Sequence, residues 1–313
     1  MSALLFPGQG SQAVGMGLEF FDKFNLVKKI FKQADERLNF PISKMILEGP
    51  ENHLQLTKNT QPAILTVSYS IFKVLVDEYG INLKSFKFFA GHSLGEYSAL
   101  VCAGALDFTD AIYLLFERGK AMQEAVPVGK GKMIALLGIK NVEVPDLLKL
   151  SDLDGGVCEI ANDNADGQII VSGNKSSIEL LQASLKEKKI KSIPLKVSAP
   201  FHCSLMKPAS KEMEDKINKT KLNKPFLNIV NNVTACPENN PENIKRLLVE
   251  QIYSTVKWRE SIIKMNKLGV KNFIEVGPGK VLSGMVKRTV KDAKTFSINS
   301  IADMKNFSDE FKK

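Results

Sequence analysis

Few residues of this sequence could build a disulfide scaffold or a metal centre. Only four cysteines occur among the 313 residues, and none forms a C-x-x-C pair: Cys102, Cys158, Cys203 and Cys236. Scattered single cysteines are typical of reduced thiols and give no spacing that would hold a metal ion. We therefore expect a cytoplasmic protein without a bound metal.

The chain also lacks any long apolar run. No stretch approaches the roughly 20 apolar residues that span a bilayer, and Met1 and Ser2 lead directly into a strand-like segment without a charged leader region. We expect no membrane association. The 44% hydrophobic content is nevertheless enough to bury a large core, in one domain with an insertion or in two domains.

Negative charge is in deficit, because 34 acidic residues oppose 43 basic ones and leave a formal net charge of +9. The basic clusters at residues 186–191 and 216–224 contain no aromatic side chains that could stack on bases, so we interpret them as solvated surface. We expect no nucleic-acid partner. A positive field does favour anionic partners.

The most informative stretch that is present reads G-H-S-L-G at residues 91–95. A short, aromatic, strand-like run precedes it at residues 86–90, and an Ala- and Leu-rich, helix-like run follows at residues 96–105. A strand, a tight glycine turn and a helix together build a nucleophile elbow, which lifts a serine hydroxyl out of a sheet. Ser93 is therefore the predicted nucleophile.

A serine hydroxyl needs a base to accept its proton, and histidine is the usual base near neutral pH. Of the three histidines, His53 lies in a polar, surface-like stretch, and His92 adjoins Ser93 but should point to the opposite face. His202 lies between a strand-like and a helix-like run, so we predict it as the base. Cys203 has no elbow around it, and we interpret it as a small buried residue.

Residues 8–13 satisfy the dinucleotide-binding pattern G-x-G-x-x-A after a strand-like run. The acidic residue that should close a second strand about 20 positions later is missing, because Asp35 and Glu36 lie in a helix-like stretch. We therefore expect no nicotinamide cofactor. The glycines favour instead a loop whose backbone amide approaches a reacting oxygen atom.

The order of the predicted elements changes along the chain. Residues 1–126 alternate strand-like and helix-like segments, as a three-layer α/β domain does. Residues 127–197 follow the order β-α-β-β-α-β, with strands predicted at 133–137, 157–161, 168–172 and 193–197 and helices at 142–150 and 176–188. This order predicts a ferredoxin-like domain.

Residues 198–313 should complete the large domain, with strands predicted at 228–233 and 272–276 and a helix at 280–290. We predict an α/β-hydrolase-like large domain into which the small ferredoxin-like domain is inserted, with residues 198–200 as the return hinge. Ser93 then lies in the large domain and His202 lies beside the hinge. The cleft between the two domains is the expected active site.

These residues make the chain resemble the malonyl-CoA:acyl carrier protein transacylases of bacterial-type fatty acid synthesis. The resemblance covers nearly the whole chain and depends on six motifs in the family's order: residues 6–12 (FPGQGSQ), 59–62 (NTQP), 91–95 (GHSLG), 118–122 (RGKAM), 200–202 (PFH) and 275–279 (EVGPG). Six motifs in order are far more specific than any one of them.

The resemblance implies a Ser93–His202 dyad rather than a triad. In this family a main-chain carbonyl, which falls at Gln251 here, orients the histidine in place of an aspartate. The backbone amides of Leu94 and Gln12 are implied to form the oxyanion hole. No aspartate of this sequence stands out as a third triad member.

The resemblance also assigns substrate recognition to Arg118, Met122 and Phe201. Arg118 lies at the edge of the apolar stripe of a helix predicted at residues 107–125, where periodicity alone favours a side chain that reaches for water. The family's arginine instead pairs with the free malonyl carboxylate, which its planar fork meets bidentately. Phe201 replaces a serine that many stand-alone relatives carry, and it would favour malonyl over methylmalonyl.

The implied function is transfer of a malonyl group from malonyl-CoA to the phosphopantetheine thiol of acyl carrier protein. The path is a ping-pong reaction through a malonyl ester on Ser93, carried out by a monomer without metal, nucleotide or redox cofactor. A serine esterase or thioesterase, which passes the acyl group to water, is the enzymatic alternative. A dinucleotide-binding module, which forms no covalent adduct, is the non-enzymatic one.

Overall fold

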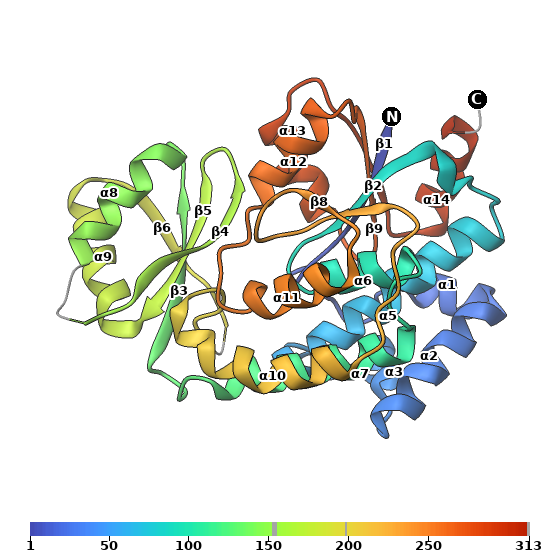
Figure 1. The fold of residues 1–313 in the computed structure, drawn as a ribbon, viewed down its shortest axis with the longest axis horizontal. Coiled ribbons are helices and arrows are strands. Elements are labelled where there is room, and N and C mark those ends of the chain that lie inside the picture. Colours follow the sequence, from blue (N-terminus) through green and yellow to red (C-terminus); the bar gives the residue numbers. More distant parts are fainter. Residues whose placement is uncertain (152–154, 198, 312–313) are drawn as a thin grey trace.

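The computed structural model describes residues 1–151, 155–197 and 199–311, which form a mixed α/β fold around two β-sheets (Figure 1). The larger sheet has the strand order β10-β9-β1-β2-β7-β8. Its strands are β1 (Ser2–Phe6), β2 (Phe86–Gly91), β7 (Asn228–Val230), β8 (Pro237–Glu238), β9 (Asn272–Val276) and β10 (Lys294–Ile298). Neighbouring strands are parallel except for β8, which pairs antiparallel with β7.

Both faces of this sheet are covered by helices, as the near-continuous apolar strands require. Along β1, Leu4 and Phe6 point into one core, whereas Ala3 and Leu5 point into the other. The first core is closed by α1 (Leu18–Lys23), α2 (Asn25–Leu38), α3 (Ile42–Glu48), α4 (Glu51–Leu54), α5 (Thr57–Asp77), α6 (Gly95–Cys102), α7 (Phe108–Glu124), α10 (Lys207–Lys219), α11 (Pro241–Gln251) and α14 (Ile301–Phe311). The second is closed by α12 (Trp258–Lys267) and α13 (Val281–Thr289).

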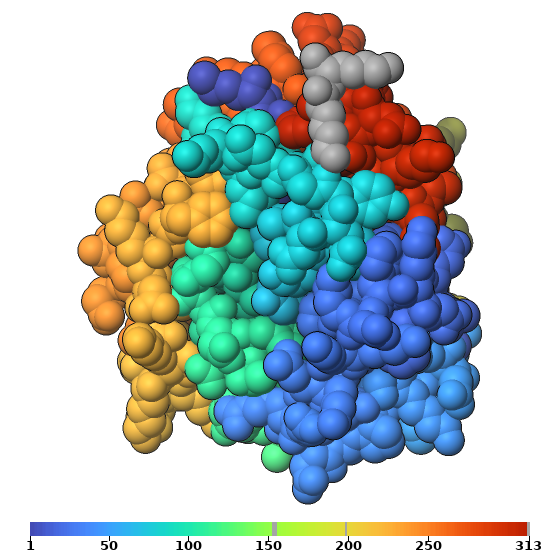
Figure 2. Space-filling model, turned by 90° about the vertical axis from the view of Figure 1, so that its right-hand side faces the viewer, coloured from blue at the N-terminus to red at the C-terminus, as the bar shows by residue number. Residues whose placement is uncertain are grey.

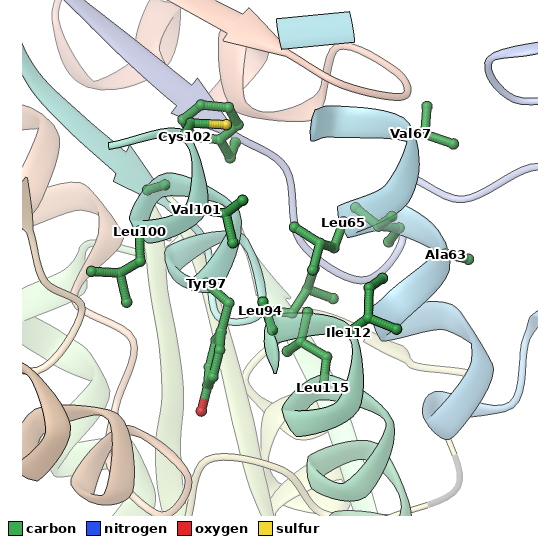
Figure 3. Packing of buried hydrophobic residues seen from close by; sticks show 14 of the residues in the cluster. Ala63, Leu65, Val67, Leu94, Tyr97, Leu100, Val101, Cys102, Ile112 and Leu115 are labelled. Carbon is green, nitrogen blue, oxygen red and sulfur yellow. The ribbon is translucent and has the colours of Figure 1, made fainter. Parts of the chain in front are cut away.

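The first core fixes the helices that surround the serine motif. Leu65 of α5, Leu94 and Leu115 of α7 meet in the space between these helices (Figure 3). Figure 2 shows the outside of this layer. The N-terminal helices, in blue, lie beside the green segment that includes α7, and the C-terminal segment, in red, lies at the top. Segments distant in sequence therefore hold the serine turn in a close-packed surrounding.

The smaller sheet is antiparallel and has the strand order β4-β5-β3-β6. In chain order its elements are β3 (Gly131–Leu137), α8 (Val144–Leu148), β4 (Cys158–Ala165), β5 (Gln168–Asn174), α9 (Lys175–Glu187) and β6 (Lys191–Pro194). Ile134, Val171 and Leu181 belong to a separate apolar core between this sheet and its two helices. The predicted order β-α-β-β-α-β is therefore the order of the structure.

Several predicted boundaries differ from the structure, among them the strand predicted at 157–161, which extends to Ala165, and three elements that end or break for local reasons. The helix predicted at residues 142–150 is divided into α8 and two flanking 3₁₀ turns, Asn141–Glu143 and Lys149–Ser151. The strand predicted at 193–197 ends at Pro194, which has no amide for the ladder. The strand predicted at 228–233 ends at Val230, because Asn231 begins a turn in which its side-chain oxygen accepts the Thr234 amide at 2.9 Å.

The two sheets are joined by specific contacts. Arg259 of α12 donates to both carboxylate oxygens of Asp163 of β4, with Nε–Oδ1 and Nη2–Oδ2 distances of 2.9 Å. Asn162 forms an isolated bridge with Val256. Of the predicted hinge residues, Ser198 lies outside the described residues, and the Pro200 ring packs against Gly131, where an added Cβ would lie 2.3 Å from it.

Among the described helices, none combines the length and the apolar character that a membrane crossing requires.

Candidate active site

Ser93 lies in the tight turn between β2 and α6. Its φ of 52° is a left-handed conformation that few residues other than glycine adopt. A Cβ on Gly91 would lie 1.8 Å from the carbonyl oxygen of Gly95, and a Cβ on Gly95 would lie 2.2 Å from that of Phe6. Both positions therefore require glycine, and the G-x-S-x-G pattern forms a strand-turn-helix elbow.

His202, which follows β6 by eight residues, faces the hydroxyl of Ser93. The Ser93 Oγ–His202 Nε2 distance is 2.8 Å, and the His202 Nδ1–Gln251 O distance is also 2.8 Å. A carbonyl oxygen can only accept a hydrogen bond, so Nδ1 carries the ring proton and Nε2 presents its lone pair to the serine. The main-chain carbonyl expected at Gln251 therefore contacts the histidine.

Burial, together with the positive charge of Arg118, lowers the pKa of His202 to about 3. The imidazole is therefore neutral at pH 7, which is the form that can accept a proton from a serine hydroxyl.

Arg118 is buried beside the serine, with 1% of its surface exposed, so it does not adopt the water-reaching position that periodicity favours. The cause is the close approach of α7 to α5: a Cβ on the neighbouring Gly119 would lie 2.6 Å from the Lys58 Cα. Arg118 Nη1 donates to Gln61 Oε1 at 2.7 Å, and Nη2 donates to Ser93 Oγ at 3.1 Å and to Gln251 Oε1 at 2.9 Å. Within the described residues its Nε has no acceptor.

The hydroxyl of Ser93 opens into a cavity of about 100 Å³. Most of the wall is apolar and includes Met122, Met133, Leu195, Val197 and Phe201. Met122 and Phe201 are thus both at the cavity, and Phe201 adjoins His202. The geometry accommodates a short acyl group with one charged end beside Arg118.

The structure does not bring Gln12 to this cavity. Its side chain accepts from the Gly10 amide at 2.7 Å and donates to Gln55 Oε1 at 2.6 Å, whereas Gln9 lines the cavity with Leu94. The register of the sheet explains the difference, because Phe6 pairs with Gly91 and the loop after β1 therefore runs beside the serine turn. Leu94 lies three residues after the end of β2, and Gln9 lies three residues after the end of β1. This equal spacing is the feature of the sequence that could have indicated Gln9.

Leu94 and Gln9 both line the cavity beside the serine. No hydrogen bond of either amide is found within residues 1–151, 155–197 and 199–311, whereas the amides of Ser93 and Gly95 are bonded to Asn232 and His92. Two free amides beside a serine hydroxyl can receive an oxyanion.

Two polar residues near the serine had no sequence signal. Asn232 Oδ1 accepts the Ser93 amide at 2.7 Å, and its Nδ2 donates to the Gly91 oxygen at 2.8 Å. Glu96, in the first turn of α6, accepts from Gln251 Nε2 at 2.7 Å and from the Asn232 amide at 3.0 Å. Only the tertiary fold joins positions this far apart in sequence.

Neither of the other two histidines, nor Cys203, takes part in the Ser93–His202 pair. His53 is exposed, whereas His92 is half-buried and lines the cavity, with its Nε2 2.8 Å from Asn164 Oδ1. Burial raises the pKa of Cys203 to about 11, so its thiol is not an activated nucleophile. Within the described residues, no three His, Cys, Asp or Glu side chains are grouped closely enough to hold a metal ion.

The model of a family described as the acyl transferase domain matches residues 3–312. The chain belongs to the acyl transferase family. It is 42% identical over 310 residues to the malonyl CoA-acyl carrier protein transacylase of Haemophilus influenzae, an alignment that covers 99% of this chain and 98% of the relative.

Solved structures of acyl transferases share the mixed α/β fold. The acyl-carrier-protein-S-malonyltransferase of Bartonella henselae matches with a TM-score of 0.96 and 39% identity, over 100% of this chain and 99% of that one. A malonyl-transacylase in complex with its type II PKS acyl-carrier protein matches with a TM-score of 0.94 and 37% identity, over 99% of each chain. The resemblance in the six motifs is thus confirmed at the level of the family and of the fold.

Proposed function

We propose that this chain transfers a malonyl group from malonyl-CoA to the thiol of an acyl carrier protein, through a malonyl ester on Ser93. The observation that carries the proposal is the guanidinium of Arg118, buried and 3.1 Å from the Ser93 hydroxyl. A fixed cation inside a small acyl cavity selects an acyl group that ends in a carboxylate. The names of the similar proteins give the same substrate class.

In the first half-reaction, His202 Nε2 takes the proton of Ser93 Oγ while that oxygen attacks the thioester carbonyl. The backbone amides of Leu94 and Gln9 donate to the oxyanion of the tetrahedral intermediate, and Gln9 takes the role that the resemblance implied for Gln12. The carbon–sulfur bond breaks, and the departing CoA sulfur receives the proton from His202. A malonyl ester remains on Ser93.

In the second half-reaction, the carrier-protein thiol gives its proton to His202, and its sulfur attacks the ester. The carbon–oxygen bond breaks, Ser93 recovers the proton from His202, and the malonyl group leaves as a new thioester. One thioester replaces another, so the balanced reaction involves no electron transfer and consumes no water. The Gln251 carbonyl stabilises the transiently protonated ring through Nδ1.

Arg118 binds the free malonyl carboxylate. Among the described residues its Nε lacks an acceptor, and Nη2 can exchange the serine oxygen for a carboxylate oxygen, so the guanidinium edge offers two parallel donors. Met122 and Phe201 form the apolar wall against the methylene group. A neutral acyl group would leave the buried charge without its partner.

We also propose that residues 1–126 and 198–313 form an α/β-hydrolase-like domain, with a ferredoxin-like domain inserted at residues 127–197. The elbow after a central parallel strand supports the first assignment. The strand order β4-β5-β3-β6, with two helices on one face, supports the second. Four free cysteines, two of them buried, support a cytoplasmic protein.

Intact-mass measurement after mixing with malonyl-CoA tests the proposed function. We expect a malonyl increment on the wild-type chain that disappears when a carrier-protein thiol is added. Ser93→Ala should form no adduct, because the covalent step has no other nucleophile, and His202→Ala should form it about 10²- to 10⁴-fold more slowly. An adduct that persists on Ser93→Ala, or an ester released only to water, would contradict malonyl transfer through this serine.

A further inference from the structure

Glu96 is an almost fully buried carboxyl group that the proposed reaction does not use. It lies three residues after Ser93, in the first turn of α6, and 1% of its surface is exposed. No Lys or Arg nitrogen lies within 4 Å of it among the described residues. Burying a carboxyl group without an ion pair costs free energy unless hydrogen bonds satisfy its oxygens.

One hydrogen-bond partner of Glu96 is Gln251, which also contacts Arg118 and His202. Gln251 Nε2 donates to Glu96 Oε2 at 2.7 Å, and Gln251 Oε1 accepts from Arg118 Nη2 at 2.9 Å. The main-chain oxygen of the same residue contacts His202 Nδ1 at 2.8 Å. Gln251 Nε2 also lies 3.2 Å from the Ser93 carbonyl oxygen and 3.3 Å from Asn232 Oδ1, but its shortest bond is the one to Glu96. An amide has one donor end and one acceptor end, so these acceptors, with Glu96 the nearest, turn the Gln251 oxygen toward Arg118.

Glu96 also supports the serine turn. The same atom, Oε2, accepts the backbone amide of Asn232 at 3.0 Å, and Asn232 clamps the amide of Ser93 and the carbonyl of Gly91. A single carboxyl oxygen thus connects the residue that clamps the nucleophile and the residue that contacts the base. Both donors lie far from Glu96 in the sequence, at separations of 136 and 155 residues.

Electrostatics agree with this arrangement. Burial raises the pKa of Glu96 to about 7, while the two hydrogen bonds and the charge of Arg118 oppose that rise. The titratable groups that face it are Arg118 of α7 and Tyr97 of α6. Oε2 can accept the bonds from Gln251 and Asn232 whether the carboxyl group is protonated or ionised. The length of the side chain, rather than its charge, is therefore what these two bonds require.

We propose that Glu96 is a positioning residue, which holds the Gln251 amide so that Arg118 faces the acyl carboxylate and His202 faces Ser93. The inference rests on the proposed function. Two variants distinguish the length of the Glu96 side chain from its charge. Glu96→Asp keeps a carboxylate but shortens the side chain by one methylene group. Glu96→Gln keeps the reach and removes the charge.

The rates of Ser93 malonylation by malonyl-CoA should therefore differ between the two variants. We expect Glu96→Asp to lose about tenfold to 10²-fold, because small misplacements of positioned groups have effects of this size. We expect Glu96→Gln to stay within about threefold of the wild type. The preference for malonyl-CoA over acetyl-CoA should fall with Glu96→Asp as well, because Arg118 loses its orientation.

Glu275 provides the matched control. It is also fully buried, its pKa is also raised by burial, and it accepts the amides of Leu282 and Ser283 at 3.0 and 2.8 Å, away from the serine. Glu275→Asp should lower the melting temperature without changing the malonyl preference. Glu96→Asp should slow the reaction less in a Gln251→Ala background than in the wild type, since only the bond of Glu96 to Asn232 then remains to be lost.

Wild-type rate and preference in Glu96→Asp would overturn the proposal, and so would an equal loss toward both acyl groups that Glu275→Asp reproduces. A sulfonyl fluoride, which modifies activated serines without CoA, separates this result from a failure of the proposed function. If the wild type formed no malonyl adduct, the proposed function would fail. Slower sulfonylation of Ser93 in Glu96→Asp than in Glu96→Gln would then still support the positioning role, and equal rates would overturn it.

Discussion

The two sheets contribute different kinds of residue to the same cavity. The six-stranded sheet and its helices provide the hydrogen-bonded polar groups, among them Ser93 after β2, Gln9 after β1 and Arg118 on α7. The four-stranded sheet and the segment after it contribute mainly apolar side chains that line the cavity, among them Met133, Leu195 and Val197.

The difference follows from strand direction. In a parallel sheet the carboxyl ends of the strands meet at one edge, so loops from several strands converge there. The antiparallel sheet has no such edge and instead presents a pleated face. We therefore expect changes on the large-sheet side to alter the charged and reacting groups, and changes on the small-sheet side to alter the fit of the substrate without altering the chemical step.

The largest effect concerns His202, which lies between the two regions. Its folded-state pKa is lowered to about 3 from an ordinary 6.5, so the ring stays neutral as the pH falls through 6.5. The acid limb of kcat/KM for malonyl-CoA that reports this base should therefore lie well below pH 6.5. In the acyl-enzyme the malonyl carboxylate offsets the charge of Arg118, so the limb of kcat should lie at a higher pH than that of kcat/KM.

Rate profiles between pH 4 and 8 check this expectation, with Glu96→Gln as the control that removes the second nearby titrating group. An acid limb of kcat/KM centred near 6.5 that persists in Glu96→Gln would contradict it.

The next effect concerns Arg118, on the large-sheet side. Arg118→Ala should lower kcat/KM for malonyl-CoA by about 10²-fold, in the range expected when one partner of a buried charge pair is removed. Acetyl-CoA should compete better, because no buried charge is left unpaired by a neutral acyl group. The ratio of the two kcat/KM values is the measurement. Arg118→Lys keeps the charge without the planar fork and should recover only part of the preference.

Preference for malonyl over acetyl that survives in Arg118→Ala would remove Arg118 from substrate recognition. The esterase alternative would then regain support.

How much the sequence could predict depended on whether the signal was local. The elbow at Ser93 could be predicted because a strand, two glycines and a helix are contiguous, and His202 because only three histidines compete. Gln9 could not be distinguished from Gln12, which the resemblance implied, because the choice depends on the register of β1 against β2. Glu96 could not be found at all, since its partners Asn232 and Gln251 are brought to it only by the fold.

The pattern of elements shows the same limit. The order β-α-β-β-α-β could be predicted from alternating apolar runs, whereas its boundaries could not. The strand predicted to extend to residue 233 stops at Val230 because the Asn231 side chain bonds its own turn. Competition between a side chain and the backbone ladder leaves little trace in hydrophobic periodicity.

A smaller effect concerns Phe201, on the segment that returns from the small sheet. Phe201 is buried and lines the cavity beside His202, where an α-methyl branch would need space. Phe201→Ser should reduce the preference for malonyl-CoA over methylmalonyl-CoA by about tenfold to 10²-fold, because one methyl group is worth about 1 to 3 kcal/mol in a pocket. Phe201→Leu, which keeps most of the bulk, should change the ratio less. An unchanged ratio in Phe201→Ser would mean that another residue closes this wall.

The smallest effect concerns Arg259, which joins α12 to Asp163 of the small sheet. The pair is bidentate and half-buried, and Asp163 adjoins Asn162, which lines the cavity. Arg259→Ala should raise the KM for malonyl-CoA by a few-fold, on the order of 1 kcal/mol, and leave kcat nearly unchanged, because it loosens the wall without touching the reacting groups. Lys32→Ala is the control, since its pair with Glu36 is exposed on both sides and should contribute almost nothing. A fall in kcat without a change in KM would show that the small sheet takes part in the chemical step, and the division between the two regions would be wrong.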